Sequence, residues 1–404
     1  YLNSMDAKGN PVIFTNGDND TFPLWYNQET EGVRTDARVC NLSYLQTDWY
    51  IDQMRRPAYD SPSLPISWTR LQYVTGTREG IPVQPDALQQ VIDYYKDSPE
   101  DLKQMLGDNP YELKNIIRHW VLNDNPDLQI FPTDSIVVTV DKEAVKRSGM
   151  MIAADSIPDV MHISLKGKRA IYKSEMMMLE MISQANWERP LYMSTTVGPD
   201  NYGHLGDNFV QEGLACRITP FDTKQSGRTI DSERMYNNMM NKFKYGGLKE
   251  NPDIYLDETV IRMCYTHRRL FNQLAQQLLK EGQKDKALKV LQRAEEEIPG
   301  SIVPHEAFYG HSLELADAWL ALGHKAEAEK LLNAVGQNAK EYIEWYLSLN
   351  TQRLLQSSRE CLMQIYILND IAKTWEPIDK KKAETYRMEV NNYASRCHQR
   401  GMSL

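Results

Sequence analysis

A run of short polar residues, Asn-Gly-Asp-Asn-Asp-Thr at positions 16–21, has the composition of a ligand-binding loop. It directly follows residues 11–15, an apolar segment with the pattern of a buried strand. Ligands of α/β proteins bind beyond the carboxyl ends of parallel strands, so a binding site is expected here. Carboxylates and an amide could hold a divalent cation or the hydroxyl groups of a sugar. The candidate binding residues are therefore Asp18, Asn19, Asp20 and Thr21.

Two other interpretations of this run stay open. The first is a turn in which Asp20 or Thr21 caps the following helix. The second is a metal-dependent enzyme, because Asp-x-Asp after an apolar strand is similar to the metal site of nucleotide-sugar transferases. Under that hypothesis, Asp18 and Asp20 would bind a divalent cation as the cofactor.

Further aromatic and acidic residues follow neighbouring segments and could meet in the same cleft. They are Trp25, Asp36, Asp48 and Trp49. The indole rings of Trp25 and Trp49 could stack on the faces of sugars, although packing in the core is the alternative for each ring. We include all four among the candidate substrate-binding residues.

The elements that would position these residues alternate between strand and helix patterns. Strands are expected at residues 11–15, 38–42, 135–140, 190–194 and 214–221, and helices at about 21–31, 85–106, 111–122 and 174–185. Such alternation is typical of a sheet covered by helices on both faces. The sequence therefore predicts an α/β domain over residues 1–245 with a mostly parallel, Rossmann-like sheet.

From residue 256 to residue 404 the pattern is helical and repeats. Tetratricopeptide units place small residues where two paired helices touch, with a period of about 34 residues. One frame starts at Arg268 and places Ala275, Gly282 and Ala287 on signature positions, and a second frame starts at Tyr309. Such units are stable only when stacked, and their surfaces bind proteins. We predict an all-α, tetratricopeptide-like helical repeat domain that binds a protein partner.

Composition excludes several functions. The net charge of −9 argues against nucleic acid as a partner, because phosphate contacts need clustered basic residues. The sequence contains no H-E-x-x-H, G-x-S-x-G, G-x-G-x-x-G or Walker A motif, and its five cysteines form no C-x-x-C pair. The sequence contains no run of 18 apolar residues, which is about the length needed to span a membrane.

Several motifs resemble a known family, a bacterial group of polytopic membrane proteins of unknown function related to protein O-mannosyltransferases. The first motif is Phe-Thr-Asn-Gly-Asp-Asn-Asp-Thr-Phe-Pro-Leu-Trp-Tyr at residues 14–26. The others are residues 31–36, 41–43, 47–52, 187–192 (Trp-Glu-Arg-Pro-Leu-Tyr) and 212–214. The resemblance covers about residues 1–225 well and the helical tail loosely. Animal relatives of the family O-mannosylate receptor ectodomains.

The resemblance implies that many membrane spans precede this soluble region, which would lie on the periplasmic side of the inner membrane. The chain begins Tyr-Leu-Asn-Ser without an initiator Met, so we expect it to be a piece of a longer polypeptide. Relatives of this class use a lipid-linked sugar and an acidic base in an early loop, which would lie upstream. No catalytic residue can therefore be assigned to this chain.

The function that we predict is an extracytoplasmic region of an O-mannosyltransferase-like membrane glycosyltransferase. The α/β domain would position a glycan or lipid-linked sugar, and the repeats would hold a protein partner. The main alternative is a non-enzymatic interaction module of a cell-envelope assembly. The Asp-x-Asp enzyme described above is a third hypothesis.

Overall fold

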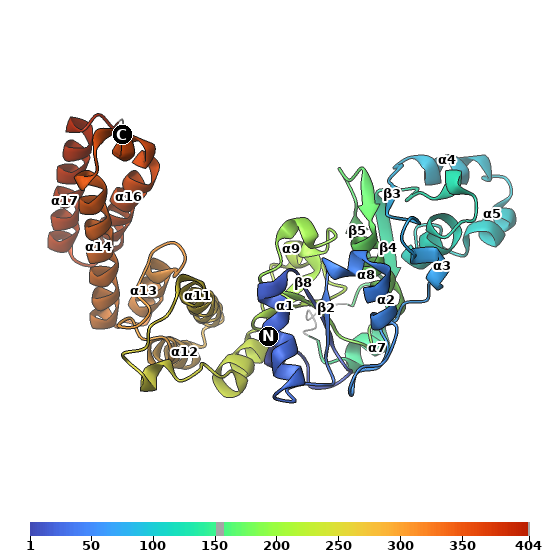
Figure 1. Cartoon of the computed structure of the whole chain (residues 1–404), viewed down its shortest axis with the longest axis horizontal. Helices are drawn as coiled ribbons and strands as arrows, with labels where there is room; N and C mark the ends of the chain where they lie inside the picture. The colour runs from blue at the N-terminus through green and yellow to red at the C-terminus, as the bar shows by residue number, and fades with distance from the viewer. Residues whose placement is uncertain (151–156, 403–404) are drawn as a thin grey trace. The chain divides into compact units, whose positions relative to one another are not determined.

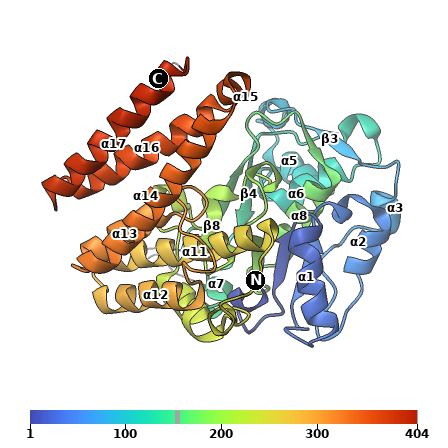
Figure 2. The same ribbon diagram turned by 60° about the vertical axis from the view of Figure 1, so that its left-hand side comes forward.

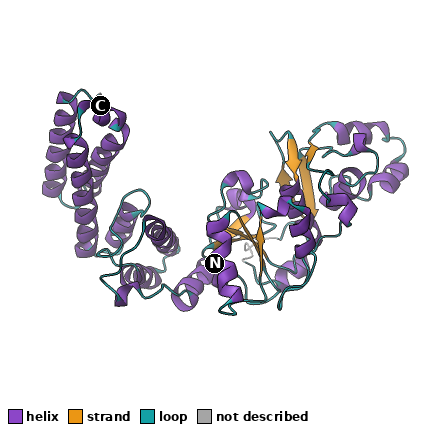
Figure 3. Ribbon diagram, viewed as in Figure 1, coloured by secondary structure: helices purple, strands orange, loops and turns teal. Residues whose placement is uncertain are grey.

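The computed structural model describes residues 1–150 and 157–402, which fall into two compact units, Tyr1–Lys242 and Phe243–Leu404. Figure 1 labels the elements along the chain, and Figure 3 shows that the described strands belong to the first unit whereas the second is helical. The chain therefore has an α/β part followed by an all-helical part.

A five-stranded sheet forms the centre of the first unit, in the order β2-β1-β7-β9-β8. Its strands are β1 (Val12–Thr15), β2 (Arg38–Asn41), β7 (Leu191–Ser194), β8 (Phe209–Gln211) and β9 (Ala215–Ile218). Strand β1 runs parallel to β2 on one side and to β7 on the other. The carboxyl ends of these three strands therefore lie at one edge of the sheet.

The sheet is mixed, which corrects the prediction of a mostly parallel sheet. Strand β9 pairs antiparallel with both β7 and β8. Only residues 212–214 connect β8 to β9. A parallel pair needs a crossover of about a dozen residues or more, so this short connection can only form a hairpin.

The first unit also contains two small antiparallel sheets. Strand β3 (Gly80–Pro82) pairs with β6 (Ala170–Tyr172), and β4 (Ser135–Thr139) pairs with β5 (Val160–Ser164). The strand expected at residues 135–140 thus exists, but it lies outside the main sheet.

The helices of the first unit are mostly short. They are α1 (Asp18–Glu29), α2 (Asp48–Met54), α3 (Arg70–Tyr73), α4 (Ala87–Tyr94), α5 (Pro99–Leu106), α6 (Leu113–Ile116), α7 (Lys142–Arg147), α8 (Lys173–Gln184), α9 (Thr223–Ser226) and α10 (Ser232–Asn237). The single helix expected over residues 85–106 is in fact α4 and α5. Pro99 starts α5 because its ring fits the first turn of a helix but would break an interior turn.

The core of this unit forms on both faces of β1. Val12 and Phe14 pack into a large cluster that includes α8, while Ile13 belongs to a smaller cluster on the opposite face. Helix α8 is buried almost along its whole length, and its four methionines, at positions 176, 177, 178 and 181, are no more than 1% exposed. Their unbranched side chains fill irregular gaps in the core.

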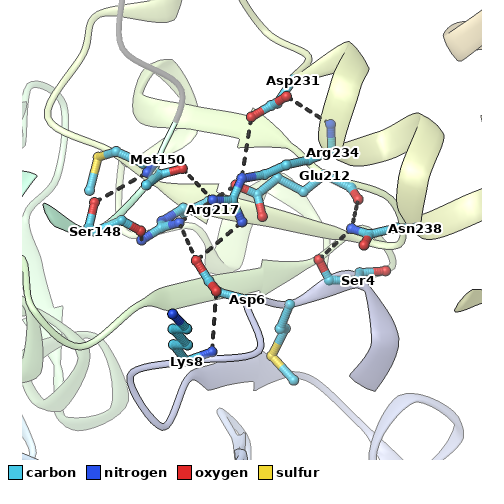
Figure 4. A network of polar contacts seen from close by, with 12 residues as sticks. Ser4, Asp6, Lys8, Ser148, Met150, Glu212, Arg217, Asp231, Arg234 and Asn238 are labelled. Carbon is cyan, nitrogen blue, oxygen red and sulfur yellow. Dashed lines mark hydrogen bonds and ion pairs between the residues drawn. The ribbon is translucent and has the colours of Figure 1, made fainter. Parts of the chain in front are cut away.

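A buried network of charges fastens the start of the chain to the antiparallel side of the sheet (Figure 4). Asp6 Oδ2 lies 3.4 Å from Arg217 Nη1 and 3.2 Å from Arg234 Nη1. Glu212 is fully buried and accepts a hydrogen bond of 2.8 Å from the Tyr192 hydroxyl. Burial raises the pKa of Glu212, and the charges of the two arginines act in the opposite direction.

The second unit is built from helices that pack in pairs (Figure 2). Its helices are α11 (Glu258–Lys280), α12 (Lys284–Glu297), α13 (Ser312–Ala321), α14 (Lys325–Ser348), α15 (Thr351–Gln356), α16 (Ser358–Trp375) and α17 (Lys380–Gln399). The turn from α11 to α12 contains Gly282, whose φ of +75° favours glycine, as expected. Ala275 and Ala287 are fully buried in this pair.

Among residues 1–150 and 157–402, the structure has no helix that combines the length and the apolar character needed to cross a bilayer. The longest helices, α11 and α14, each carry several charged residues.

Replacing Ala287 by Leu should lower the stability of the helical unit by about 1–3 kcal/mol, because extra methyl groups would overpack a closed helix contact. The control is Lys289→Leu on the same helix, where the exposed side chain should tolerate the change within about 0.5 kcal/mol. Urea unfolding measured by circular dichroism compares the two. Equal effects would contradict the helix contact.

Replacing Arg217 by Met should destabilise the first unit by about 3–5 kcal/mol, because it removes one partner from a buried set of charges. The exposed Arg228 provides the control, and Arg228→Met should change the free energy of unfolding by no more than about 0.5 kcal/mol. The measurement is urea unfolding followed by tryptophan fluorescence. An Arg217 variant as stable as the control would show that the network is dispensable.

Candidate functional site

The acidic turn lies where β1 ends and α1 begins. Gly17, with a φ of +77°, is the N-cap residue, and no side chain caps the helix. The alternative in which Asp20 or Thr21 is the cap is therefore wrong. Asp18 and Asn19 are exposed in the first turn of α1, while Asp20 is half-buried. The turn thus leaves two polar side chains in solvent and directs the third towards the protein.

Thr21 has a structural role at the centre of this turn. Its side chain is fully buried, and its Oγ1 lies 2.8 Å from Thr15 Oγ1 and donates to the Gly17 carbonyl at 2.8 Å. Asn41, at the end of β2, donates from Nδ2 to the same Thr21 oxygen at 2.7 Å. These bonds leave Thr21 no free group for a ligand, and they hold the ends of β1 and β2 together.

Asp20 faces the end of β7. Burial raises the pKa of Asp20, while the Thr196 side chain and the Asn16 backbone act in the opposite direction. Thr196 Oγ1 in turn lies 2.6 Å from Ser194 Oγ, the last residue of β7. The acidic turn and the β7 end therefore form a single polar surface at the carboxyl edge of the parallel strands.

An aromatic surface adjoins the acidic turn. Its rings contact one another in the order Phe22, Trp25, Tyr44, Trp49 and Tyr50, with centroids 5.5–6.3 Å apart. Phe22 and Trp49 are 46% and 49% exposed, whereas Tyr50 is buried. The predicted residues Trp25 and Trp49 thus belong to one cluster, which packs against the core on one side and meets solvent on the other.

Asp36 and Asp48 do not join the acidic turn. Asp36 precedes β2, so it lies at the amino end of the parallel strands, where it forms a two-point ion pair with Arg34. This pairing lowers the pKa of Asp36. Asp48 starts α2 and accepts from the Thr75 backbone at 3.4 Å, which lowers its pKa. Both carboxylates have protein partners, so their placement gives no support to a shared ligand cleft.

Metal ligands are sparse in the described part of the chain. Across residues 1–150 and 157–402, no three or more His, Cys, Asp or Glu side chains are grouped so that they could hold a metal ion. A divalent cation at Asp18 and Asp20 would therefore need further ligands from backbone, water or substrate. The site is better suited to hydrogen bonding with hydroxyl groups.

Some residues of the site were not among those predicted from the sequence. Asn41, Ser194 and Thr196 complete the polar edge, and Tyr44 links the two tryptophans. A usable signal existed for the first three, because each is a polar residue at or just beyond the end of a predicted strand. Tyr44 offered no such signal, since its role depends on the tertiary placement of Trp25 and Trp49 on either side of it.

Asp20→Asn should make the first unit less sensitive to pH. Because the pKa of folded Asp20 is raised above the ordinary 3.8, the stability from this group is present below that value and is lost as pH rises through the folded pKa. The variant should remove this loss, so its melting temperature at neutral pH should equal or exceed that of the wild type. Melting curves across acidic and neutral pH measure the effect. The exposed Asp18 gives the control, since Asp18→Asn should leave the melting temperature unchanged.

Comparison with known proteins assigns a family to the first unit. No curated protein and no solved structure matches the chain. The family model described as TMEM260-associated domain 2 matches residues 1–238. That range contains the acidic turn, the aromatic surface and nearly all of the first unit. The chain therefore belongs to the family of the TMEM260-associated domain 2.

Proposed function

We propose that the first unit binds carbohydrate and positions it for an O-mannosyltransferase-like membrane glycosyltransferase. In this proposal the chain is the extracytoplasmic, C-terminal region of that protein, on the periplasmic side of the inner membrane. The motif resemblance at residues 14–26 and the family match both support this context.

The observation that carries the proposal is the aromatic surface beside the acidic turn. Phe22 and Trp49 expose about half of their surface, next to a half-buried carboxylate and an exposed amide, Asp20 and Asn19. Aromatic faces pack against the C–H faces of sugars. A carboxylate accepts hydrogen bonds from the sugar hydroxyls, and a side-chain amide can both accept from them and donate to them. This combination suits a sugar better than a purely apolar or a strongly charged ligand.

The role proposed is positioning, without catalysis by this chain. Asp36 and Asp48, two of the carboxylates that could have completed an active centre, have protein partners. The Asp20 carboxylate and the exposed Asp18 do not form a close set with a third acidic residue, histidine or cysteine among the described residues. In this proposal, the acidic side chain that acts as the general base for sugar transfer belongs to another part of the whole protein.

The second unit would hold a protein partner through tetratricopeptide-like helix pairs. Ala275, Ala287, Ala316 and Ala328 lie fully buried, as small residues do in such pairs. Helix α14 presents Tyr342 and Trp345, about half exposed and one turn apart. Aromatic residues of this kind are enriched at the centres of protein interfaces.

Binding of manno-oligosaccharides to the purified chain tests the carbohydrate proposal. We expect measurable binding by calorimetry, and we expect Trp49→Ala to weaken it by about tenfold through the loss of one stacking face. Tyr94→Ala provides the control, because Tyr94 is exposed on α4 outside the aromatic surface. Absence of binding to any sugar, or equal loss in both variants, would favour the interaction-module alternative.

A further inference from the structure

A cleft of about 540 Å³ opens along β2, the strand at the edge of the main sheet, between α1 and α2. Its wall includes Trp25, Tyr50 and Met54, which are apolar or aromatic, and two arginines, Arg38 and Arg56. Ligand pockets commonly have volumes of about 300–1,000 Å³. The cleft is therefore large enough for a small organic ligand.

Arg38 is the unusual residue of this cleft. It is the first residue of β2 and is only 5% exposed. Its Nη2 donates to the carbonyls of Arg56, Ser61 and Pro62 at 3.0–3.4 Å. Its Nε and Nη1 are buried and have no hydrogen-bond partner among the described residues. Buried donors without partners are rare, because each one costs free energy.

Among the described residues, no acidic side chain compensates the charge of Arg38. The groups that act on it electrostatically are Cys40 and Tyr50, and burial raises the pKa of both, that of Cys40 to about 12. Both are therefore neutral at physiological pH. The Arg189 guanidinium adds positive charge to the same region, because burial and, after it, the charge of Arg38 lower the pKa of Arg189.

Carboxylates near the cleft have other partners. Glu29 accepts from the Tyr59 hydroxyl, and Asp60 accepts from Thr35 Oγ1. Within the described parts of the chain, neither forms an ion pair with Arg38. A buried cation without a counter-ion is costly, and an anion in the cleft would remove that cost.

Arg56 lies close to Arg38, since its carbonyl accepts the Arg38 hydrogen bond, and its own side chain is exposed. We propose that this cleft binds the oxyanion of a phosphate- or carboxylate-bearing ligand, with Arg38 as the buried anchor and Arg56 as the second cation. Guanidinium groups match the geometry of both oxyanions. Trp25 and Met54 would contact the apolar part of the ligand. This site lies on the β2 edge and shares Trp25 with the aromatic surface, but its two cations, Arg38 and Arg56, take no part in the carbohydrate proposal.

The test titrates the full chain with inorganic phosphate and with acetate by calorimetry, at an ionic strength matched with sodium chloride. Arg56→Gln is the informative variant, because its exposed side chain can be replaced without breaking the Arg38 bonds, which use the Arg56 backbone. We expect Arg56→Gln to weaken binding by about tenfold. The control is Arg118→Gln, at an exposed arginine on another element, and it should bind like the wild type.

The outcomes separate clearly. Tighter binding of phosphate than of acetate assigns the ligand as a phosphate compound, and the reverse assigns a carboxylate. No heat of binding with either anion overturns the proposal. Equal heats of anion binding in the wild type and both variants would also overturn the proposal, because they would reflect the general effect of these salts on proteins. Trp49→Ala should leave anion binding unchanged, so failure of the carbohydrate proposal and failure of this one are distinguishable.

Discussion

The ion network around Asp6 and Glu212 is the constraint on which the first unit depends. It joins the beginning of the chain to β9 and α10, segments more than two hundred positions later in sequence. Arg217 and Glu212 are buried away from water within it, so their charges must be balanced by neighbouring charges, and any backbone movement that separates them is costly. The antiparallel edge of the sheet is therefore fixed from one end of the unit to the other. The parallel edge, where the polar and aromatic residues lie, can then be built on a rigid support.

Strand β2 is where the two surfaces of the unit meet. The Tyr50 hydroxyl accepts from the Asn41 N–H at 2.9 Å and donates to the Val39 carbonyl at 3.3 Å. It thus occupies backbone groups of an edge strand that another chain could otherwise pair with. One face of the aromatic surface lies towards the acidic turn, while Trp25 and Tyr50 also line the cleft beside Arg38. The positions of α1 and α2 beside β2 consequently shape both places.

Local patterns in the sequence predicted much of this unit. The strands β1, β2 and β7 and the helix α8 lie near their expected positions, because short apolar runs and breakers are local signals. The same reasoning selected Asp20 and Trp49 as candidate binding residues, which stays a prediction. The direction of β9 could not be predicted from its apolar pattern, which is the same in parallel and antiparallel pairs. Asp36 was misplaced because the order and direction of strands decide which edge a residue reaches. Arg38 was missed because an arginine in a strand usually points to solvent.

The methionines of α8 illustrate how the packed core also determines chemical durability. A thioether is readily converted to a sulfoxide by peroxides, and the added oxygen is polar. Inside this core such an oxygen would find few donors and would disrupt the contacts of β1. Because Met176, Met177, Met178 and Met181 are shielded, oxidants reach them chiefly when the unit opens. The rate at which these four sulfur atoms are oxidised would therefore report how often the core opens.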